Sequence, residues 1–342
     1  MRIRGAGRVG ALMGHVIGAV RRRSPHGLVL LYHRIAGPRF DPLLLDVAPA
    51  HFDAQLAVLR ESARVLPLTE FESLRRRGAL PPRAVAVTFD DGYADNLHTA
   101  VPLLARHEVP ATVFITTGMI GATREFWWDD VERVVAGASV LTGSAPVAGV
   151  RWRGEVAAVP LRRPWSLEVR AASAPREQLY RDLFNVLRPM RAPERAAAMA
   201  TLRAWAGVPD AARESHRALS EAELLDLAGR PGMTIGAHSV SHPPLALLDE
   251  AAQRQELAGS RHALERVLAR AVPTVAYPFG TRHDVSTATT RAARAAGFDV
   301  ALANEPGAAW RWSSRWRVPR VLVRDWDAEE FRRRLVEWQD AT

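Results

Sequence analysis

The stretch that decides the fold is Ala84-Val-Ala-Val-Thr-Phe89, which runs directly into Asp90-Asp91-Gly92-Tyr93. A short run of apolar and β-branched residues is typical of a strand buried on both faces, as in a parallel sheet covered by helices. Its flanks support this interpretation, because 94–107 has helical spacing and 110–116 is a second apolar run. A strand, a helix and a strand in succession predict a parallel α/β sheet or barrel.

The same alternation continues on both sides of this unit, with one long interruption. Residues 122–218 break the rhythm, and we interpret them as a helical insertion in a domain that spans 27–342. Residues 1–26 are a separate basic segment. The further strands expected are 27–35, 232–237, 273–277, 298–303 and 318–323, and the further helices are 50–61, 69–77, 220–229, 249–270, 286–296 and 327–338.

Composition excludes several classes of protein. The chain has 342 residues, a formal net charge of +9 and no cysteine, which excludes disulfide frameworks, zinc–thiolate sites and thiol nucleophiles. The chain has no lysine, so its permanent positive charges are all arginines. They are scattered and lack the base-stacking aromatic residues of a nucleic-acid-binding module. We therefore expect no nucleic-acid partner.

The N-terminal segment combines arginines with the apolar run 11–20, which is too short to cross a bilayer. The run ends in Arg21, Arg22 and Arg23 rather than in the small residues of a signal-peptide cleavage site. An amphipathic helix on an anionic membrane surface and an ordinary N-terminal helix both fit this pattern. A monomer, cytoplasmic or peripherally bound to a membrane, is expected.

Two acidic residues and two histidines are the candidates for chemistry. Asp90 and Asp91 follow a buried strand, where two desolvated carboxylates repel each other unless a cation is bound. His238 and His242 follow another strand, and their spacing suits two imidazole ligands of one ion. One carboxylate and two imidazoles leave Zn²⁺ an open position for water, and a second carboxylate can take the proton of that water. Taken alone, each motif also fits a plain turn or incidental histidines.

Three motifs, in this order, resemble the polysaccharide deacetylase family with a NodB-type homology domain: 88–93 (TFDDGY), 238–242 (HSVSH) and 276–280 (AYPFG). The resemblance extends over about residues 27–325. It implies a distorted (β/α)7-type barrel and hydrolysis of acetyl groups on glycans. It also implies one divalent metal ion, with Zn²⁺ preferred and Co, Ni, Mn or Fe as alternatives.

Carried over by position, the resemblance also implies roles for single residues. Asp91, His238 and His242 match the metal ligands, and Asp90 matches the base that activates water. The Ser239 hydroxyl matches a group that supports the histidine motif. The backbone N–H of Phe279 matches an oxyanion contact, and Tyr277 of the same motif is expected near the substrate.

The sequence departs from the family pattern at two places. Many members have an arginine that orients the base at the position of Ala276, and Arg320 in the segment Val318-Pro319-Arg320 is the candidate replacement. Many members also have a late histidine as general acid, which is missing here. His33, in a Tyr-His segment typical of a subgroup with a circularly rearranged barrel, is the candidate acid, with His283 as its rival.

The activity expected is metal-dependent removal of N-acetyl groups from an amino-sugar polysaccharide or a lipid-linked glycan. Trp128 is a candidate platform for a sugar ring, although core packing is equally common for such a residue. De-O-acetylation or deformylation of a glycan is the catalytic alternative. A non-catalytic glycan-binding protein on the same barrel is the alternative from another class.

Overall fold

The computed structural model describes residues 25–37, 40–138, 140–150, 153–157, 165–168 and 174–340. The predicted membrane contact through the basic N-terminal segment falls on residues 1–24, which lie outside this range. Within the described part of the chain, no helix is both long enough and apolar enough to cross a membrane.

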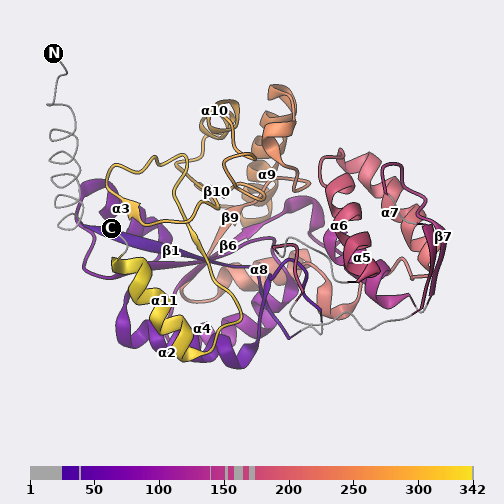
Figure 1. Ribbon diagram of the computed structural model, residues 1–342. Coiled ribbons are helices and arrows are strands. Elements are labelled where there is room, and N and C mark those ends of the chain that lie inside the picture. Colours follow the sequence, from indigo (N-terminus) through magenta and orange to yellow (C-terminus); the bar gives the residue numbers. More distant parts are fainter. Residues whose placement is uncertain are drawn as a thin grey trace, which may run out of the picture.

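Parallel strands form one curled sheet at the centre of the molecule (Figure 1). Each strand pairs in parallel with its neighbour in the order β11-β10-β9-β6-β5-β1-β13. Two short strands, β4 (Arg64–Val65) and β12 (Ala309–Trp310), extend it beside β5 and β1. The parallel strands are β1 (His26–Tyr32), β5 (Ala84–Phe89), β6 (Ala111–Ile115), β9 (Met233–Ala237), β10 (Thr274–Ala276), β11 (Val300–Leu302) and β13 (Val321–Leu322).

The two edges of this curled sheet meet through the segment 318–323. On one side, the Ala303 N–H donates to the carbonyl of Val318 at 2.9 Å. On the other side, β13 runs parallel to β1, and the Val323 N–H donates to the carbonyl of Leu31 at 2.9 Å. The segment pairs over only a few residues, so the barrel is closed but distorted. The predicted α/β barrel is confirmed.

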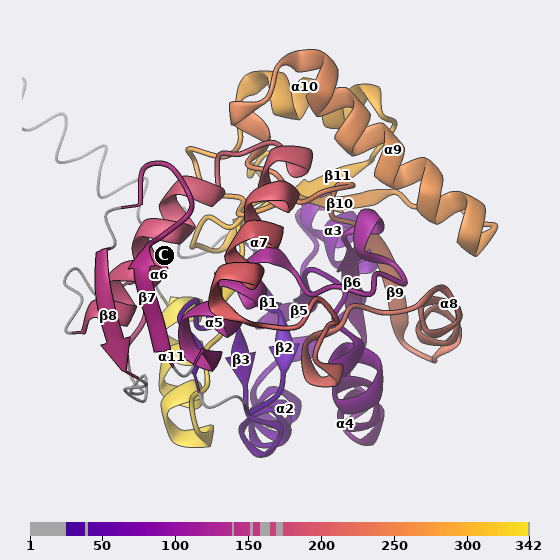
Figure 2. The ribbon, with the colours of Figure 1, turned by 90° about the vertical axis from the view of Figure 1, so that its right-hand side faces the viewer.

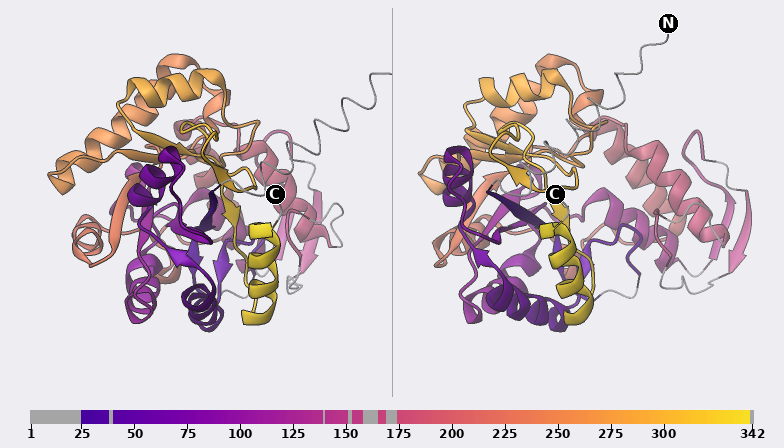
Figure 3. Two further views of the ribbon diagram at one scale, coloured as in Figure 1. Left: turned by 90° about the vertical axis from the view of Figure 1, so that its left-hand side faces the viewer. Right: turned by 60° about the vertical axis from the view of Figure 1, so that its left-hand side comes forward.

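Helices cover the outside of the barrel, as Figure 3 shows from two sides. Several begin at side-chain caps, which satisfy backbone donors that have no partner inside the helix. Ser220 and Glu223 form a capping box at the start of α8, and Asp249 caps α9 through the Ala252 N–H. The covering helices are α2 (Pro49–Ser62), α3 (Leu68–Arg77), α4 (Val101–Arg106), α8 (Glu221–Gly229), α9 (Glu250–Leu268), α10 (Thr287–Ala295) and α11 (Ala328–Asp340).

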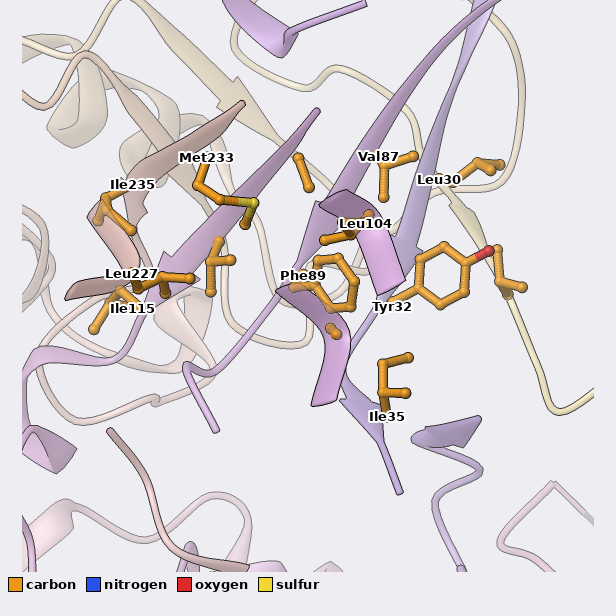
Figure 4. Packing of buried hydrophobic residues seen from close by; sticks show 14 of the residues in the cluster. Leu30, Tyr32, Ile35, Val87, Phe89, Leu104, Ile115, Leu227, Met233 and Ile235 are labelled. Carbon is orange, nitrogen blue, oxygen red and sulfur yellow. The ribbon is translucent and has the colours of Figure 1, made fainter. Parts of the chain in front are cut away.

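Alternate residues of each strand face opposite sides of the barrel wall. Outward-facing side chains such as Leu30, Val87 and Ile235 pack against helices, where Leu104 of α4 and Leu227 of α8 join them (Figure 4). The inward-facing layer is smaller and comes from different positions on the same strands. It includes Val29, Ala86, Phe114, Ala276, Leu302 and Val318.

The segment between β6 and α8 builds a second body beside the barrel, at the right of Figure 1. Helices α5 (Trp127–Gly137), α6 (Pro175–Leu187) and α7 (Ala192–Ala206) pack around their own apolar cluster. An antiparallel pair, β7 (Val140–Ser144) with β8 (Arg153–Ala157), lies at its far side. No described strand of this segment joins the barrel sheet.

The narrow barrel interior leaves no room for a side chain at Gly236 in β9. A Cβ atom there would lie 2.3 Å from Cδ1 of Phe114 and 2.8 Å from Oγ1 of Thr274. We expect Gly236→Ala to lower the free energy of unfolding by about 1–3 kcal/mol, the usual cost of overpacking. Urea denaturation measures this change in the free energy of unfolding. Gly229→Ala is the matched control because a Cβ there meets nothing within 4 Å, and equal stability of both variants would contradict the packing argument.

Candidate active site

Asp90 and Asp91 lie at the carboxyl end of β5 and point to different partners. The Asp90 N–H donates to the carbonyl of Tyr32, which continues the strand pairing by one residue. At Asp91 the backbone turns, with φ of 75° there and 86° at Gly92. Both side chains are buried, and the turn brings the Asp91 carboxylate against the two histidines that follow β9.

Three side chains converge as a metal-ligand set. Oδ1 of Asp91 lies 3.5 Å from Nε2 of His238 and 3.3 Å from Nε2 of His242. All three ligand atoms lie within 4.8 Å of one another. Oδ1 of Asp91 has no hydrogen-bond partner among the described residues. Nδ1 of His238 lies 2.9 Å from the carbonyl of Ala276, which fixes the proton there and leaves Nε2 free as a ligand.

The protonation of this trio suits a cation. Burial raises the pKa of the Asp91 carboxyl, although the nearby His33 and His238 oppose it. Burial lowers the pKa of His238, and it lowers the pKa of His242 to about 3, so both imidazoles are neutral at neutral pH. Neutral imidazoles and a carboxylate that needs compensation are the donor set preferred by Zn²⁺ and similar ions. The residues present therefore fit a divalent metal ion.

Arg320 forms a bidentate ion pair with Asp90. Its two terminal nitrogens donate to Oδ1 and Oδ2, each at 2.7 Å, and its Nε donates to the carbonyl of Ala303 at 3.1 Å. Burial alone would raise the pKa of Asp90, but the Arg320 guanidinium and His238 outweigh it and lower that pKa to about 2. The structure thus places Arg320 where the sequence analysis expected a substitute for the missing arginine at position 276.

The loop that carries both histidines is held from α9. Oε2 of Glu256 accepts from the N–H groups of Val240 and Ser241, each at 2.8 Å, and the Ser241 hydroxyl donates to Oε1 at 2.5 Å. The Ser239 hydroxyl accepts from the His242 N–H at 3.0 Å. Ser239 and His242 both have positive φ, of 62° and 55°. These bonds hold a backbone shape that L-residues adopt rarely.

Trp128 packs against His242 at the candidate site. It is 3% exposed, and its ring centroid lies 4.7 Å from that of His242. Its indole N–H donates to the Tyr93 hydroxyl at 2.8 Å, which in turn donates to Oδ2 of Asp129 at 2.7 Å. These contacts fix the indole against His242, while the predicted stacking of Trp128 on a sugar ring stays a prediction.

Phe279 and Tyr277 of the third motif lie in different environments. Phe279 has φ of 58°, and its ring packs 4.8 Å from the His242 ring, beside the trio. Tyr277 directly follows β10 and is fully buried in the outward-facing layer with Val275 and Ala301. Strand alternation puts its side chain on the opposite face from Ala276, and its expected substrate contact stays a prediction.

His33 follows β1 at the same end of the barrel. Its Nδ1 atom is buried without a hydrogen-bond partner among the described residues. Burial lowers the pKa of its imidazole to about 4, against the opposing charges of Asp91 and Asp90. The rival His283 is exposed and accepts a hydrogen bond from Nε of Arg282 at 3.1 Å. Only His33 of this pair is electrostatically linked to the metal-ligand set.

Sequence reasoning missed three residues that hold the site together. Glu256 binds the histidine loop, while Tyr93 and Asp129 fix Trp128. Glu256 lies within an amphipathic helix, where one more acidic residue carries no signal. Tyr93 is the last residue of the first motif and Asp129 follows the candidate Trp128, and these positions were the available hint.

A curled parallel barrel with acidic and imidazole groups at the carboxyl ends of its strands defines a class of α/β-barrel enzymes. The model of the polysaccharide deacetylase family matches residues 77–141 and 185–301, more than half of the chain. The chain belongs to the polysaccharide deacetylase family. The unmatched stretch between the two segments falls within the second body.

Similar proteins agree with this family. A poly-beta-1,6-N-acetyl-D-glucosamine N-deacetylase of Staphylococcus aureus is 30% identical over 134 residues, which is 33% of this chain and 46% of that protein. The chain thus spans about half the length of the curated relatives it matches. The Streptococcus pyogenes deacetylase PplD, solved with acetate, shares the fold with a TM-score of 0.58 and 17% identity, over 92% of this chain and 99% of that one. A de-N-acetylase from Aggregatibacter actinomycetemcomitans has a TM-score of 0.56 and 12% identity, over 91% and 100% of the two chains.

The Asp90–Arg320 pair predicts a pH-dependent stability. The pKa of Asp90 is about 2 in the fold against an ordinary 3.8, so the pair stabilises the fold above about pH 4. That stabilisation is lost as the pH falls from about 4 to about 2. Arg320→Met leaves a buried carboxylate without its partner, and we expect a loss of about 3–5 kcal/mol at pH 7.

Urea denaturation of chelator-treated protein at pH 7 and pH 3 measures this loss. The difference between wild type and Arg320→Met should shrink at pH 3. Arg332→Met, which breaks the exposed pair with Glu61, is the control and should cost less than about 1 kcal/mol. Arg320→Met as stable as wild type at pH 7 would rule out the ion pair as a support of the site.

Proposed function

We propose that this chain is a metal-dependent deacetylase that hydrolyses N-acetyl groups on amino-sugar glycans, either polymers of N-acetylglucosamine or lipid-linked precursors. The observation that carries the proposal is the convergence of Asp91, His238 and His242 beside a carboxylate, Asp90, that Arg320 keeps ionised. The substrate named for the staphylococcal relatives supports the choice of glycan.

The chain's own residues divide the chemistry between them. Asp91, His238 and His242 would hold the metal ion. When bound, a divalent ion supplies a Lewis acid that polarises the acetamido carbonyl and lowers the pKa of water. Asp90 is ionised at neutral pH, and its Oδ2 lies 3.7 Å from Nε2 of His238, so it can accept a proton at the edge of the ligand set.

The leaving amine needs a proton, and His33 is the candidate donor. Because its pKa is held at about 4, its imidazole is neutral at neutral pH and must first receive a proton. The proton lost by the attacking water, taken up at Asp90, is the available source. The backbone N–H of Phe279 would donate to the oxygen that becomes negative during attack.

De-O-acetylation and deformylation remain the catalytic alternatives, because the same ligand set and base would serve an ester or a formamide. Analysis of the products distinguishes them. Acetate and a free amine indicate N-deacetylation, acetate with an intact amide indicates ester cleavage, and formate indicates deformylation. A protein that binds glycans without releasing any acid would instead be a binding module.

Asp90→Asn tests the division of labour between base and ligands. We expect about one divalent ion per chain in wild type and in the variant, with acetate release lowered by about 10²–10⁴-fold, because Asn keeps the size of the side chain but cannot accept the proton. The variant also loses the charge that pairs with Arg320, so its activity is measured at a temperature at which it is folded. Metal analysis and acetate release from N-acetylglucosamine oligomers measure both. His242→Ala is the control, and it should lose the ion as well as activity. Unchanged turnover in Asp90→Asn would refute the role of Asp90.

His33→Ala tests the proton donor. The variant should retain the metal ion and lose about 10²-fold or more in turnover, since protonation of a poor leaving group is removed. His283→Ala should behave as wild type because that side chain is exposed and lies outside the ligand set. The reverse pattern, with activity lost only in His283→Ala, would transfer the role to His283.

A further inference from the structure

A cavity of about 220 Å³ lies between the second body and the histidine loop. Figure 2 shows α5 and α7, which form its outer walls, in front of the barrel strands. Most of its lining is apolar, with Met119, Met199 and Trp127 among the larger side chains. His242 forms part of the inner wall, so the cavity reaches the metal-ligand set itself.

Arg195 of α7 lines this cavity and is only 5% exposed. Its terminal nitrogens donate to the carbonyls of Met190 at 3.2 Å and Ser241 at 3.1 Å, and its guanidinium lies 5.4 Å from the Trp127 ring centroid. Neither carbonyl carries a full negative charge. Within the described ranges, no carboxylate forms an ion pair with Arg195.

Four of the other five buried arginines in the described part of the chain have such partners, while the fifth, Arg176, donates to the carbonyls of Val135 and Ala138. Arg34 pairs with Asp95, Arg75 with Glu72, Arg133 with Asp130 and Arg320 with Asp90, at 2.7–3.2 Å. A buried charge without a counter-charge is costly, and proteins normally pair it. The contrast within one chain indicates that the partner of Arg195 comes from outside it.

The charges around the cavity are consistent with a bound anion. Arg124 also lines it, is exposed, and has no ion pair among the described residues. The two acids of the lining are already engaged, Glu125 by Arg213 and Asp130 by Arg203. Burial lowers the pKa of Arg195, and the negative charge of Glu256 opposes this shift. Both carboxylate oxygens of Glu256, however, accept hydrogen bonds from the histidine loop.

We propose that this cavity is a subsite for an anionic group, a carboxylate or phosphate, carried by the glycan next to the N-acetylated sugar. Arg195 would donate to the anion's oxygens, with Arg124 at the edge, while Trp127 and the methionines cover the adjoining carbon skeleton. The anion's place on the substrate rests on the proposed deacetylase function, whereas the binding of an anion in this cavity does not depend on that function.

Calorimetric titration of chelator-treated protein tests the subsite without turnover. The probes are methyl glucuronide, its neutral match methyl glucoside, and inorganic phosphate. We expect at least one of the two anions to bind roughly tenfold or more tightly than the glucoside. A tighter glucuronide assigns a uronic acid, and a tighter phosphate assigns a phosphate-bearing glycan. Equal binding of all three probes overturns the proposal.

Two substitutions locate the binding. Arg195→Gln should abolish the preference for anions, although it also removes a donor to the histidine loop. Met199→Glu is the second variant, because the introduced carboxylate lies one helical turn from Arg195 and can pair with it. Both polar replacements of the buried Met199 should lower the melting temperature, but Met199→Glu should melt no lower than Met199→Gln because its carboxylate pairs with Arg195. Met199→Glu should abolish the anion preference that Met199→Gln still shows. An anion preference that survives in Met199→Glu excludes this cavity.

Acetate release from neutral N-acetylglucosamine oligomers is measured separately on the metal-loaded protein. If no acetate is released, a measured anion preference still identifies an anion site. If no anion preference is found, the measured acetate release still stands.

Discussion

Asp90 and Asp91 are buried side by side, and the site depends on their charges being balanced in two different ways. Asp90 meets a guanidinium in bidentate contact, while Oδ1 of Asp91 faces two neutral imidazoles and has no hydrogen-bond partner among the described residues. One carboxylate is thereby fixed as an anion by the protein itself. The other lies in a ligand set that fits a divalent cation as its counter-charge. The left-handed turn at Asp91 and Gly92 makes this separation because it directs neighbouring side chains to different partners.

The barrel supplies the rest by bringing together residues that are distant in the sequence. The barrel interior is narrow and is lined by small residues at Ala86, Gly236 and Ala276. Arg320 reaches Asp90 from the closing segment. The carbonyl of Ala276 then orients His238. An arginine at 276 would approach the same carboxylate from another strand, so the chain keeps the contact while changing the element that provides it.

Much of this architecture could be predicted because strand and helix periodicities are local. The predicted strand 84–89 has the same bounds in the fold, and the helix predicted at 249–270 spans 250–268. The metal-ligand set also follows from spacing and motif. The strands β7 and β8 were missed, since a Gly-rich and Ala-rich stretch gives no alternation to read. The positions of Tyr277 and Trp128 depended on which face each side chain takes, and packing decides that. Glu256 and Arg195 could not be found, because their partners are backbone groups on other elements.

The closing segment has a consequence for the order in which the protein matures. Asp91, His238 and His242 have all been synthesised before Arg320, which directly precedes β13, the last strand of the barrel sheet. A nascent chain emerging from the ribosome could therefore assemble its ligands, and even capture an ion, while Asp90 still lacks its guanidinium. The counter-charge of Asp90 would therefore arrive only with the C-terminal residues, after the Asp91, His238 and His242 side chains are in place.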